Sequence, residues 1–310
     1  MKNLFIIPVP DEFDFGLCLS FLKRSPREIL HACDGDHVVK LMRVNDQAVL
    51  FRLREMKNRS LQVEVLNTPC TPEIRTALEA YIREWFDLDT DMKPFYSMAT
   101  RDKHLKELVK RYRGYRIVGH PDLFESLVWA VIGQQINLSF AYTLKQRFVE
   151  KFGGRVTVDD RTHYLFPDPG TVSKLRSDDL LPLQFSRQKS NYTIGIAEAF
   201  ASGSLSKEKL RGQSLREAKE MLMQIKGIGN WTASYALMKT FHFPDAFPLE
   251  DAGLHNALKY QLKLDRKPTL AEVARVFKKY EGWEAYATLY LWKSLGFAPQ
   301  RRGERRGPQR

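Results

Sequence analysis

The chain has 310 residues, enough for about two or three packed units, and its 43% hydrophobic content is ordinary for a globular protein. Lys and Arg total 49 against 37 Asp and Glu, and the formal charge of +12 favours a polyanionic partner, nucleic acid before an acidic membrane surface. The three cysteines, Cys18, Cys33 and Cys70, lack the spacing of a disulfide framework, a zinc site or an iron–sulfur cluster.

The first residues do not have the pattern of a signal peptide, because Pro8, Pro10 and acidic residues interrupt the early apolar run. No apolar stretch reaches membrane-spanning length. We therefore expect a soluble, cytoplasmic protein without a membrane partner, associated with the nucleoid if its source is bacterial.

Residues 1–70 have the pattern of an antiparallel α+β domain. A helix is expected at residues 15–24, between the first two of four strand-like segments, LFIIPV, HVVKLMRV, QAVLFRLRE and RSLQVEVLN. The segment contains no catalytic constellation. Its basic residues are expected to form a solvated face rather than a binding stripe.

From Thr71 onward strand signals nearly vanish, and residues 155–213 are expected to be short helices and connectors. Helical periodicity and capping patterns predict helices within residues 71–86, 102–116, 122–154, 186–203, 214–225, 230–241, 252–264, 271–281 and 284–296. The 122–154 segment is expected to contain two helices with a junction at 133–137.

Two adjacent glutamines, Gln134 and Gln135, occupy that junction. Their long amide side chains could bond base edges or fill a gap in a base stack. A surface break between two helices is the simpler interpretation of these two residues alone.

The segment from Ser214 to Asp251 contains two helices around Gly227-Ile228-Gly229. Glycines at such a corner let backbone N–H groups face outward, and amides at a helix start bind phosphate rather than bases. The alternative is an αα-hairpin whose glycines only make the turn.

Aromatic and acidic residues follow this hairpin. Trp231 and Tyr235 are four residues apart and share a helix face, and Asp251 of the Glu250-Asp251 pair comes after the Pro248 break. A further tryptophan, Trp292, lies in the last predicted helix. Individually, such aromatics are more often core residues, and Asp251 could be only a helix N-cap.

Taken together, these features resemble the helix-hairpin-helix DNA glycosylases. The resemblance rests on LMQIKGIGNWTASYA at 222–236, the acidic pair at 250–251 and GQQI at 133–136. With WEAYATLYLW at 283–292, the order and spacing are most similar to the alkylation-repair branch of the DNA-3-methyladenine glycosylase II type. The resemblance covers nearly the whole chain except the arginine-rich end.

The resemblance implies an α+β protein overall. An N-terminal antiparallel-sheet α+β domain, residues 1–70, would precede a mostly α, two-lobed helix-hairpin-helix glycosylase body at 71–298. The lobes would comprise approximately residues 116–240, and residues 71–115 plus 241–298. Residues 299–310 would be a basic disordered tail.

The resemblance also assigns roles. Asp251 would be the catalytic aspartate, Trp231, Tyr235 and Trp292 would line the base pocket, and the amides of Gly227, Ile228 and Gly229 would bind a DNA phosphate. The family often holds a monovalent cation at this hairpin, which makes the carbonyls of Ile225 and Gly227 candidate ligands. Gln134 and Gln135 would fill the gap left by a flipped base, where this branch can use an apolar wedge.

The implied activity is hydrolysis of the N-glycosidic bond of alkylated purines in double-stranded DNA by base flipping. The main expected substrate is 3-methyladenine, with 7-methylguanine as a second candidate, and the expected product is an abasic site. Bifunctional relatives carry lysine where this chain has Trp231, so no lyase step is expected. No cysteine follows Cys70, so no iron–sulfur cluster or other cofactor is expected beyond the cation, and a monomer is expected. The alternatives are a non-catalytic helix-hairpin-helix DNA-binding protein and a monofunctional glycosylase for deaminated bases.

Overall fold

The computed structural model describes residues 3–57 and 59–297. The tail predicted at 299–310 lies outside the described residues. The N-terminal part is a five-stranded antiparallel sheet of order β1-β5-β4-β3-β2. Its strands are β1 (Leu4–Pro8), β2 (His31–Asp34), β3 (His37–Val44), β4 (Gln47–Glu55) and β5 (Ser60–Val65). The predicted antiparallel α+β character is confirmed, and the edge strand β2 was not predicted.

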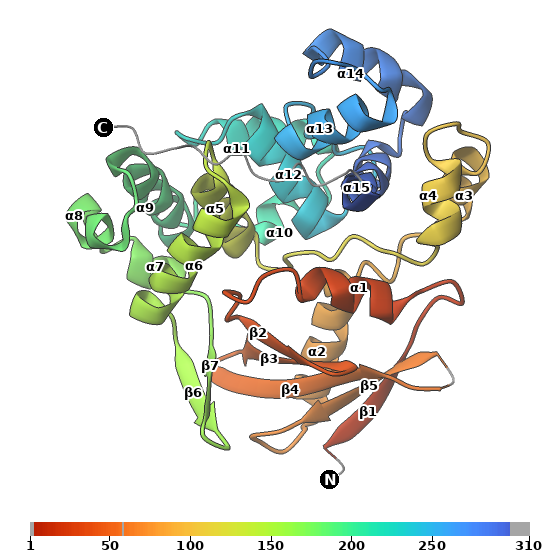
Figure 1. Cartoon of the computed structure of the whole chain (residues 1–310). Helices are drawn as coiled ribbons and strands as arrows, with labels where there is room; N and C mark the ends of the chain where they lie inside the picture. The colour runs from red at the N-terminus through yellow and green to blue at the C-terminus, as the bar shows by residue number, and fades with distance from the viewer. Residues whose placement is uncertain (1–2, 58, 298–310) are drawn as a thin grey trace, which may run out of the picture.

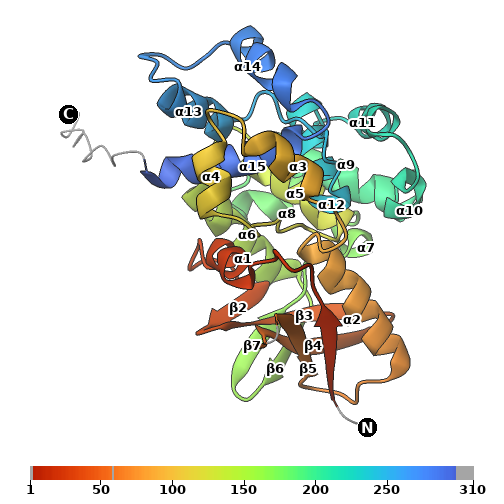
Figure 2. The same cartoon turned by 90° about the vertical axis from the view of Figure 1, so that its right-hand side faces the viewer.

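Two helices cover this sheet. Helix α1 (Phe15–Leu22) lies between the sheet and the helical body (Figure 1), and α2 (Pro72–Trp85) runs along the sheet (Figure 2). Thr71 caps α2 by accepting a hydrogen bond from the backbone N–H of Ile74, and the proline at its first position suits a helix start. The apolar side of α2 then packs against the sheet, with Tyr81 and Trp85 edge-on to Phe51.

The rest of the described chain is mainly helical, as predicted. The remaining α-helices are α3 (Lys93–Ala99), α4 (Lys106–Arg111), α5 (Leu123–Gly133), α6 (Leu138–Phe152), α7 (Pro169–Val172), α8 (Ser177–Leu180), α9 (Arg187–Ala201), α10 (Lys207–Leu210), α11 (Leu215–Met223), α12 (Asn230–Phe241), α13 (Ala252–Gln261), α14 (Leu270–Phe277) and α15 (Glu284–Ser294). Short 3₁₀ turns occupy Leu181–Leu183, Lys278–Tyr280 and Leu295–Phe297. None of the described helices is long and apolar enough to cross a membrane.

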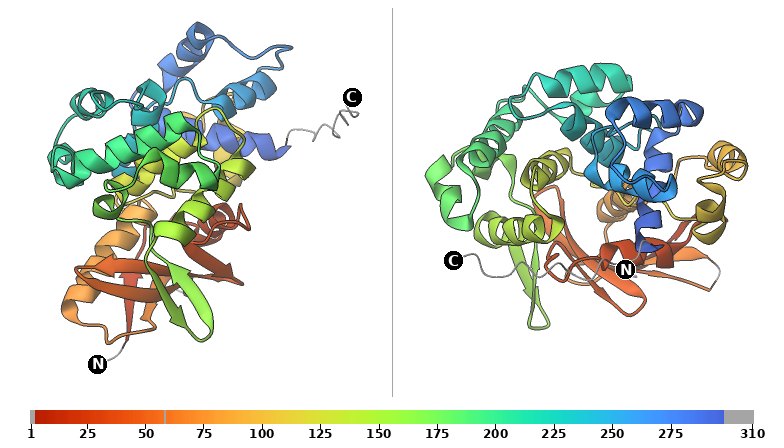
Figure 3. Two further views of the ribbon diagram at one scale, coloured as in Figure 1. Left: turned by 90° about the vertical axis from the view of Figure 1, so that its left-hand side faces the viewer. Right: turned by 45° about the horizontal axis from the view of Figure 1, so that its top comes forward.

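The prediction of only helices and connectors after residue 155 was wrong at one place. A β-hairpin, β6 (Arg155–Val158) and β7 (Arg161–Tyr164), leaves the end of α6 and extends beside the sheet (Figure 3). Its strands have four residues each, and Asp159 and Asp160 both adopt positive φ at the turn. That backbone conformation is typical of a two-residue hairpin turn of type I′, for which Asp is favoured after Asn and Gly.

The apolar side chains form two cores. The first joins the sheet, α1 and α2 to α3, α4 and the C-terminal helices α13–α15. The second lies within residues 123–237 and is built mainly by α5, α6, α9, α11 and α12. Helix α12 contributes to both, because Met238 lies in the first core and Leu237 in the second. The boundary predicted at residue 70 stays a prediction, although the sheet and the C-terminal helices share a core.

Candidate functional site: an aromatic cleft behind a glycine hairpin

The glycine hairpin between α11 and α12 is shaped by close packing. Gly227 has φ +96°, and a Cβ there would lie 2.2 Å from the ring of Tyr192. Only glycine combines that left-handed conformation with such a close approach. The hairpin is tied to the α5–α6 junction, because the Gln134 amide donates to the Gly227 carbonyl at 3.1 Å and to Thr232 Oγ1 at 3.0 Å.

The start of α12 is open on its outer side. Gly229 precedes the helix, makes no side-chain cap, and a Cβ at this position would meet nothing within 4 Å. The first N–H groups of a helix lack intrahelical partners, and they carry the positive end of the helix dipole. This end of α12 can therefore take an anionic oxygen from outside.

Three aromatic residues and one carboxylate meet beside the hairpin. The rings of Trp231 and Tyr235 stack at 5.3 Å with an interplanar angle of 22°. Asp251 Oδ2 accepts from Trp231 Nε1 at 3.1 Å, and Asp251 Oδ1 accepts from Trp292 Nε1 at 2.8 Å. The structure thus brings Trp231, Tyr235, Trp292 and Asp251 together.

Local sequence fixes Asp251 in this position. The residue is the N-cap of α13, with Oδ1 accepting from the Leu254 N–H at 2.7 Å. The neighbouring Glu250 carboxylate accepts from the Asn230 amide at 2.7 and 2.8 Å, which ties the loop to the hairpin. Oδ2 accepts only the Trp231 hydrogen bond among the described residues, so it keeps a lone pair for a further ligand.

Gly253 leaves room for Trp292. A Cβ at Gly253 would lie 3.0 Å from Asp251 Oδ1 and 3.2 Å from Trp292 Nε1. Both distances are tighter than ordinary carbon contacts, so a larger residue would push the indole away from the carboxylate. The spacing between Asp251 and Trp292 therefore depends on a residue that carries no side chain.

These residues line one open cleft of about 1100 Å³ between the two cores. Trp129 and Tyr235 add aromatic surface to its wall, and Asp251 and Trp292 lie in the same lining. This volume is slightly above the usual range for small-molecule sites, so the cleft has room for more than a single purine. An electron-poor aromatic ring entering it would meet π-faces and a carboxylate.

The two glutamines of the junction differ in what they contact. Gln134 is engaged with the hairpin, whereas Gln135 is exposed, has φ +57° and lies at the rim of the cleft. Leu138, whose side chain is 55% exposed, lines the same rim. Of the two predicted gap-filling residues, Gln135 is the one whose amide is not committed to the hairpin.

The carbonyls predicted to bind a monovalent cation each accept one hydrogen bond. Ile225 O accepts from the Ile228 N–H at 3.0 Å, and Gly227 O accepts from Gln134. A carbonyl oxygen has two lone pairs, so both can still bind a cation, which stays a prediction. Among residues 3–57 and 59–297, no group of three or more His, Cys, Asp and Glu side chains is placed to hold a metal.

Two basic residues lie close to the hairpin and the cleft. The Lys189 ammonium donates to the carbonyls of Val131 and Gln134 at 3.1 and 2.6 Å, and also to Ile132, so it closes the end of α5. Burial lowers the pKa of Lys189 to about 8. Arg24 reaches the cleft from the N-terminal domain. Sequence reasoning missed Arg24, because no local pattern distinguishes it from an ordinary surface cation.

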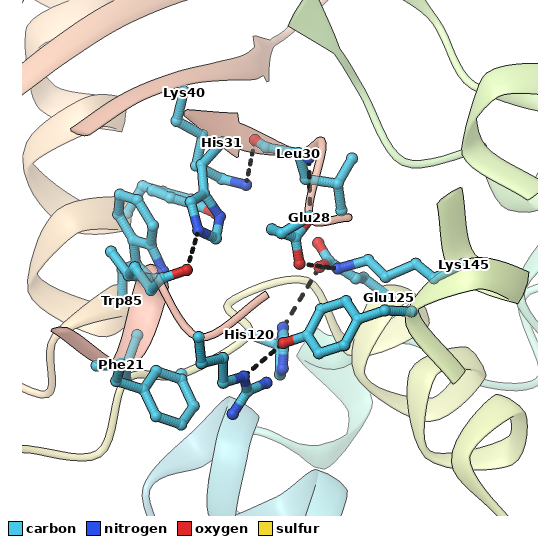
Figure 4. Close-up of a pocket in the computed structure, with 15 residues that line it drawn as sticks. Phe21, Glu28, Leu30, His31, Lys40, Trp85, His120, Glu125 and Lys145 are labelled. Atoms are coloured by element: carbon cyan, nitrogen blue, oxygen red, sulfur yellow. Dashed lines mark hydrogen bonds and ion pairs between the residues drawn. The ribbon is translucent and has the colours of Figure 1, made fainter. Parts of the chain in front are cut away.

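A second, enclosed cavity of about 30 Å³ lies between the sheet and the helical body (Figure 4). Lys145 there pairs with Glu28 at 2.9 Å and with Glu125 at 3.4 Å, and His120 lies 3.3 Å from Glu125. Burial opposes ionisation of Glu28, but Lys145 and His31 lower its pKa to about 2. Burial lowers the pKa of His120 to about 4, so its neutral ring donates to Glu125.

Residues 128–281 match the HhH-GPD superfamily of base excision DNA repair proteins, and residues 24–127 match the N-terminal domain of 8-oxoguanine DNA glycosylase. A DNA-3-methyladenine glycosylase of Bacillus subtilis is 38% identical over 297 residues, covering 95% of this chain and 98% of the relative.

Two solved structures share the fold. The 3-methyladenine DNA-glycosylase of Archaeoglobus fulgidus has a TM-score of 0.82 at 22% identity, over 96% of this chain and 99% of that chain. The 3-methyladenine DNA glycosylase of Schizosaccharomyces pombe, in complex with abasic DNA, has a TM-score of 0.56 at 28% identity, over 65% of this chain and 95% of that chain.

Proposed function

The chain belongs to the helix-hairpin-helix superfamily of base excision DNA repair glycosylases, in its alkylation-repair branch, and we propose that it is a monofunctional glycosylase for alkylated purines. It would release 3-methyladenine and 7-methylguanine from double-stranded DNA and leave an abasic site. The observation that carries the proposal is the Asp251 carboxylate, which two indole N–H groups hold at the wall of an aromatic cleft.

The chemistry follows from the charges involved. Breaking the N-glycosidic bond builds positive charge on the sugar, and a fixed carboxylate stabilises that charge without reorganising. The free lone pair of Asp251 Oδ2 faces no other donor among the described residues, so it can approach the sugar or orient the attacking water. Trp231 and Tyr235 offer a π-surface. An electron-poor alkylated base stacks on such a surface more strongly than an undamaged base does.

DNA would be held through its backbone. The open amides at the start of α12 face outward beside the cleft, and they suit one phosphate. A base stacked in duplex DNA cannot reach a carboxylate in a cleft, so the damaged nucleotide would rotate out of the helix. Gln135 at the rim would then fill the vacated space.

The absence of a lyase step is part of the proposal. A Schiff base requires an amine near the sugar carbon. Trp231 occupies the position beside Asp251 where a bifunctional relative would carry lysine, and the lysine that lines the cleft, Lys239, donates to the Val118 carbonyl. Strand cleavage is therefore not expected.

The test is the Asp251→Asn variant on methylated duplex DNA. Asparagine keeps the size and an acceptor for the N-cap, but it removes the negative charge. We expect base release to fall about 10²–10⁴-fold while affinity for an abasic duplex is retained. Base release at the wild-type rate would show that the carboxylate is not catalytic. The Glu250→Gln variant is the matched control, because its carboxylate accepts from Asn230 instead of the indoles.

A deaminated purine is the second candidate substrate, and the Arg24 guanidinium in the cleft favours it because it can donate to a carbonyl oxygen. A duplex with a single hypoxanthine tests this candidate. Release of hypoxanthine at a rate comparable with that of methylated bases would establish it.

A further inference from the structure

Arg24 is a permanently charged donor that faces the cleft without a carboxylate partner. Its Nε–H donates to the Tyr142 hydroxyl, and its guanidinium carbon lies 3.9 Å from the ring centroid of Phe21. Among the described residues, no ion pair involves Arg24, and no acceptor takes a hydrogen bond from its Nη atoms. Guanidinium has five N–H donors, so four of them remain for a ligand.

The enclosed cavity fixes this arginine in place. Glu28, four residues along the chain, is bonded to Lys145 of α6, and Arg27 donates to Ser139 at 3.2 Å. The Glu28 carboxylate also accepts from the Leu30 N–H at 2.9 Å, which shapes the loop. The segment that carries Arg24 is therefore anchored on the helical body, and its guanidinium projects from a rigid support.

Contacts along the cleft place Arg24 at the end away from Asp251. Asp251 bonds to Trp231, which stacks on Tyr235 one helical turn later. Arg24 bonds instead to Tyr142, whose ring lies 4.9 Å from that of Trp129, another residue of the cleft lining. A purine bound with its glycosidic bond at Asp251 would direct its opposite, base-pairing edge along this wall. That edge carries the 6-substituent of the purine.

We infer that Arg24 is a specificity-determining residue that donates to an acceptor on the far edge of the extruded base. The inference deepens the proposed function and rests on it. A 6-oxo purine presents a carbonyl oxygen that guanidinium can bond, whereas a 6-amino purine presents further donors that oppose it. Arg24 therefore favours 7-methylguanine over 3-methyladenine.

The same bond assists departure of the base. As the N-glycosidic bond breaks, its electron pair stays with the purine, so the carbonyl oxygen becomes a better acceptor. Arg24 at the base end and Asp251 at the sugar end then stabilise opposite charges. Both methylated purines carry a positive charge before cleavage, so the repulsion by Arg24 largely cancels in a comparison of the two.

The experiment uses duplex DNA treated with dimethyl sulfate, which contains both methylated bases in one sample. Initial release rates of 7-methylguanine and 3-methyladenine are measured by chromatography for the wild type, Arg24→Gln and the control Lys23→Gln. Lys23 is exposed and donates to the Gly35 carbonyl, away from the cleft. We expect Arg24→Gln to lower the ratio of the 7-methylguanine release rate to the 3-methyladenine release rate about ten-fold. The reason is that the loss of one base-specific contact has an effect of this size. Lys23→Gln should leave the ratio unchanged.

An unchanged ratio in Arg24→Gln, or a proportional fall of both rates, would overturn the inference and assign Arg24 a purely structural role. Arg24→Lys is the second variant; it keeps the charge over Phe21 but loses the Nη pair, and an intermediate ratio is expected. Urea unfolding midpoints check that each variant is folded. If the wild type releases neither base, the proposed function itself fails, and the inference fails with it.

Discussion

The enclosed cavity and the open cleft treat charge in opposite ways. In the enclosed one, Lys145 lies between Glu28 and Glu125, and the charges are neutralised within the cavity. In the open cleft, the described residues offer Asp251 only N–H donors, and they offer Arg24, which borders both cavities, only a hydroxyl acceptor. The paired charges of the enclosed cavity support the fold. In the cleft, the opposite charges of Asp251 and Arg24 are not paired with each other, so both remain able to interact with a ligand.

The largest effect is expected from breaking the enclosed cavity. Lys145→Met leaves the carboxylates of Glu28 and Glu125 buried without their shared cation, which costs about 3–5 kcal/mol of unfolding free energy. Urea unfolding followed by circular dichroism measures this loss. Lys151→Met, on the exposed side of the same helix, should change stability by less than about 0.5 kcal/mol. Equal effects of the two substitutions would contradict the pairing argument.

Acid should weaken the same cavity. Burial lowers the pKa of His31 and His120 from 6.5 to about 4, so the unfolded chain binds these protons first as the pH falls. The free energy of unfolding should therefore decrease from about pH 6.5 to about pH 4. Glu28, with a pKa of about 2 against 4.5, adds a further loss below about pH 4.5. Urea titrations across this range measure the slope, and it should flatten in His31→Gln. A flat profile in the wild type would refute the prediction.

A smaller effect is expected at the hairpin beside the cleft. Gly227→Ala places a methyl group within 2.2 Å of Tyr192 and should misplace the amides that face DNA. We expect affinity for duplex DNA to fall about ten-fold, because losing one hydrogen bond to a charged group costs roughly 1.5 kcal/mol. Fluorescence anisotropy with a labelled abasic duplex measures it.

Gly212→Ala is the control for backbone strain. Gly212 also has positive φ, +85°, but a Cβ there meets nothing within 4 Å. It should share the strain cost without weakening DNA binding. If both substitutions weakened binding equally, the Tyr192 contact would have no specific role.

Local patterns in the sequence sufficed for much of the cleft. The spacing of Trp231 and Tyr235 predicted one shared face, and the two rings do stack. A helix was predicted within residues 214–225, and α11 does begin there, with Ser214 and Glu217 forming a capping box. These features depend on residues three or four apart, where helical geometry determines the contact.

The rest depends on contacts between distant parts of the chain. Arg24 meets Tyr142 across 118 residues, and Lys145 meets Glu28 across 117. The N-terminal domain contained no catalytic constellation in sequence, yet two of its residues, Phe21 and Arg24, line the cleft. The β6–β7 hairpin was missed because its strands have four residues each, too short for a clear alternating pattern.

The division of the apolar residues between two cores has a consequence for synthesis on the ribosome. The core within residues 123–237 is contiguous, so it can close while the last helices are still being made. The other core needs the first strands and α13–α15 together, so the sheet must wait for nearly the whole chain. The sheet is translated first but should complete its packing last, and the cleft between the cores should form only at that final step.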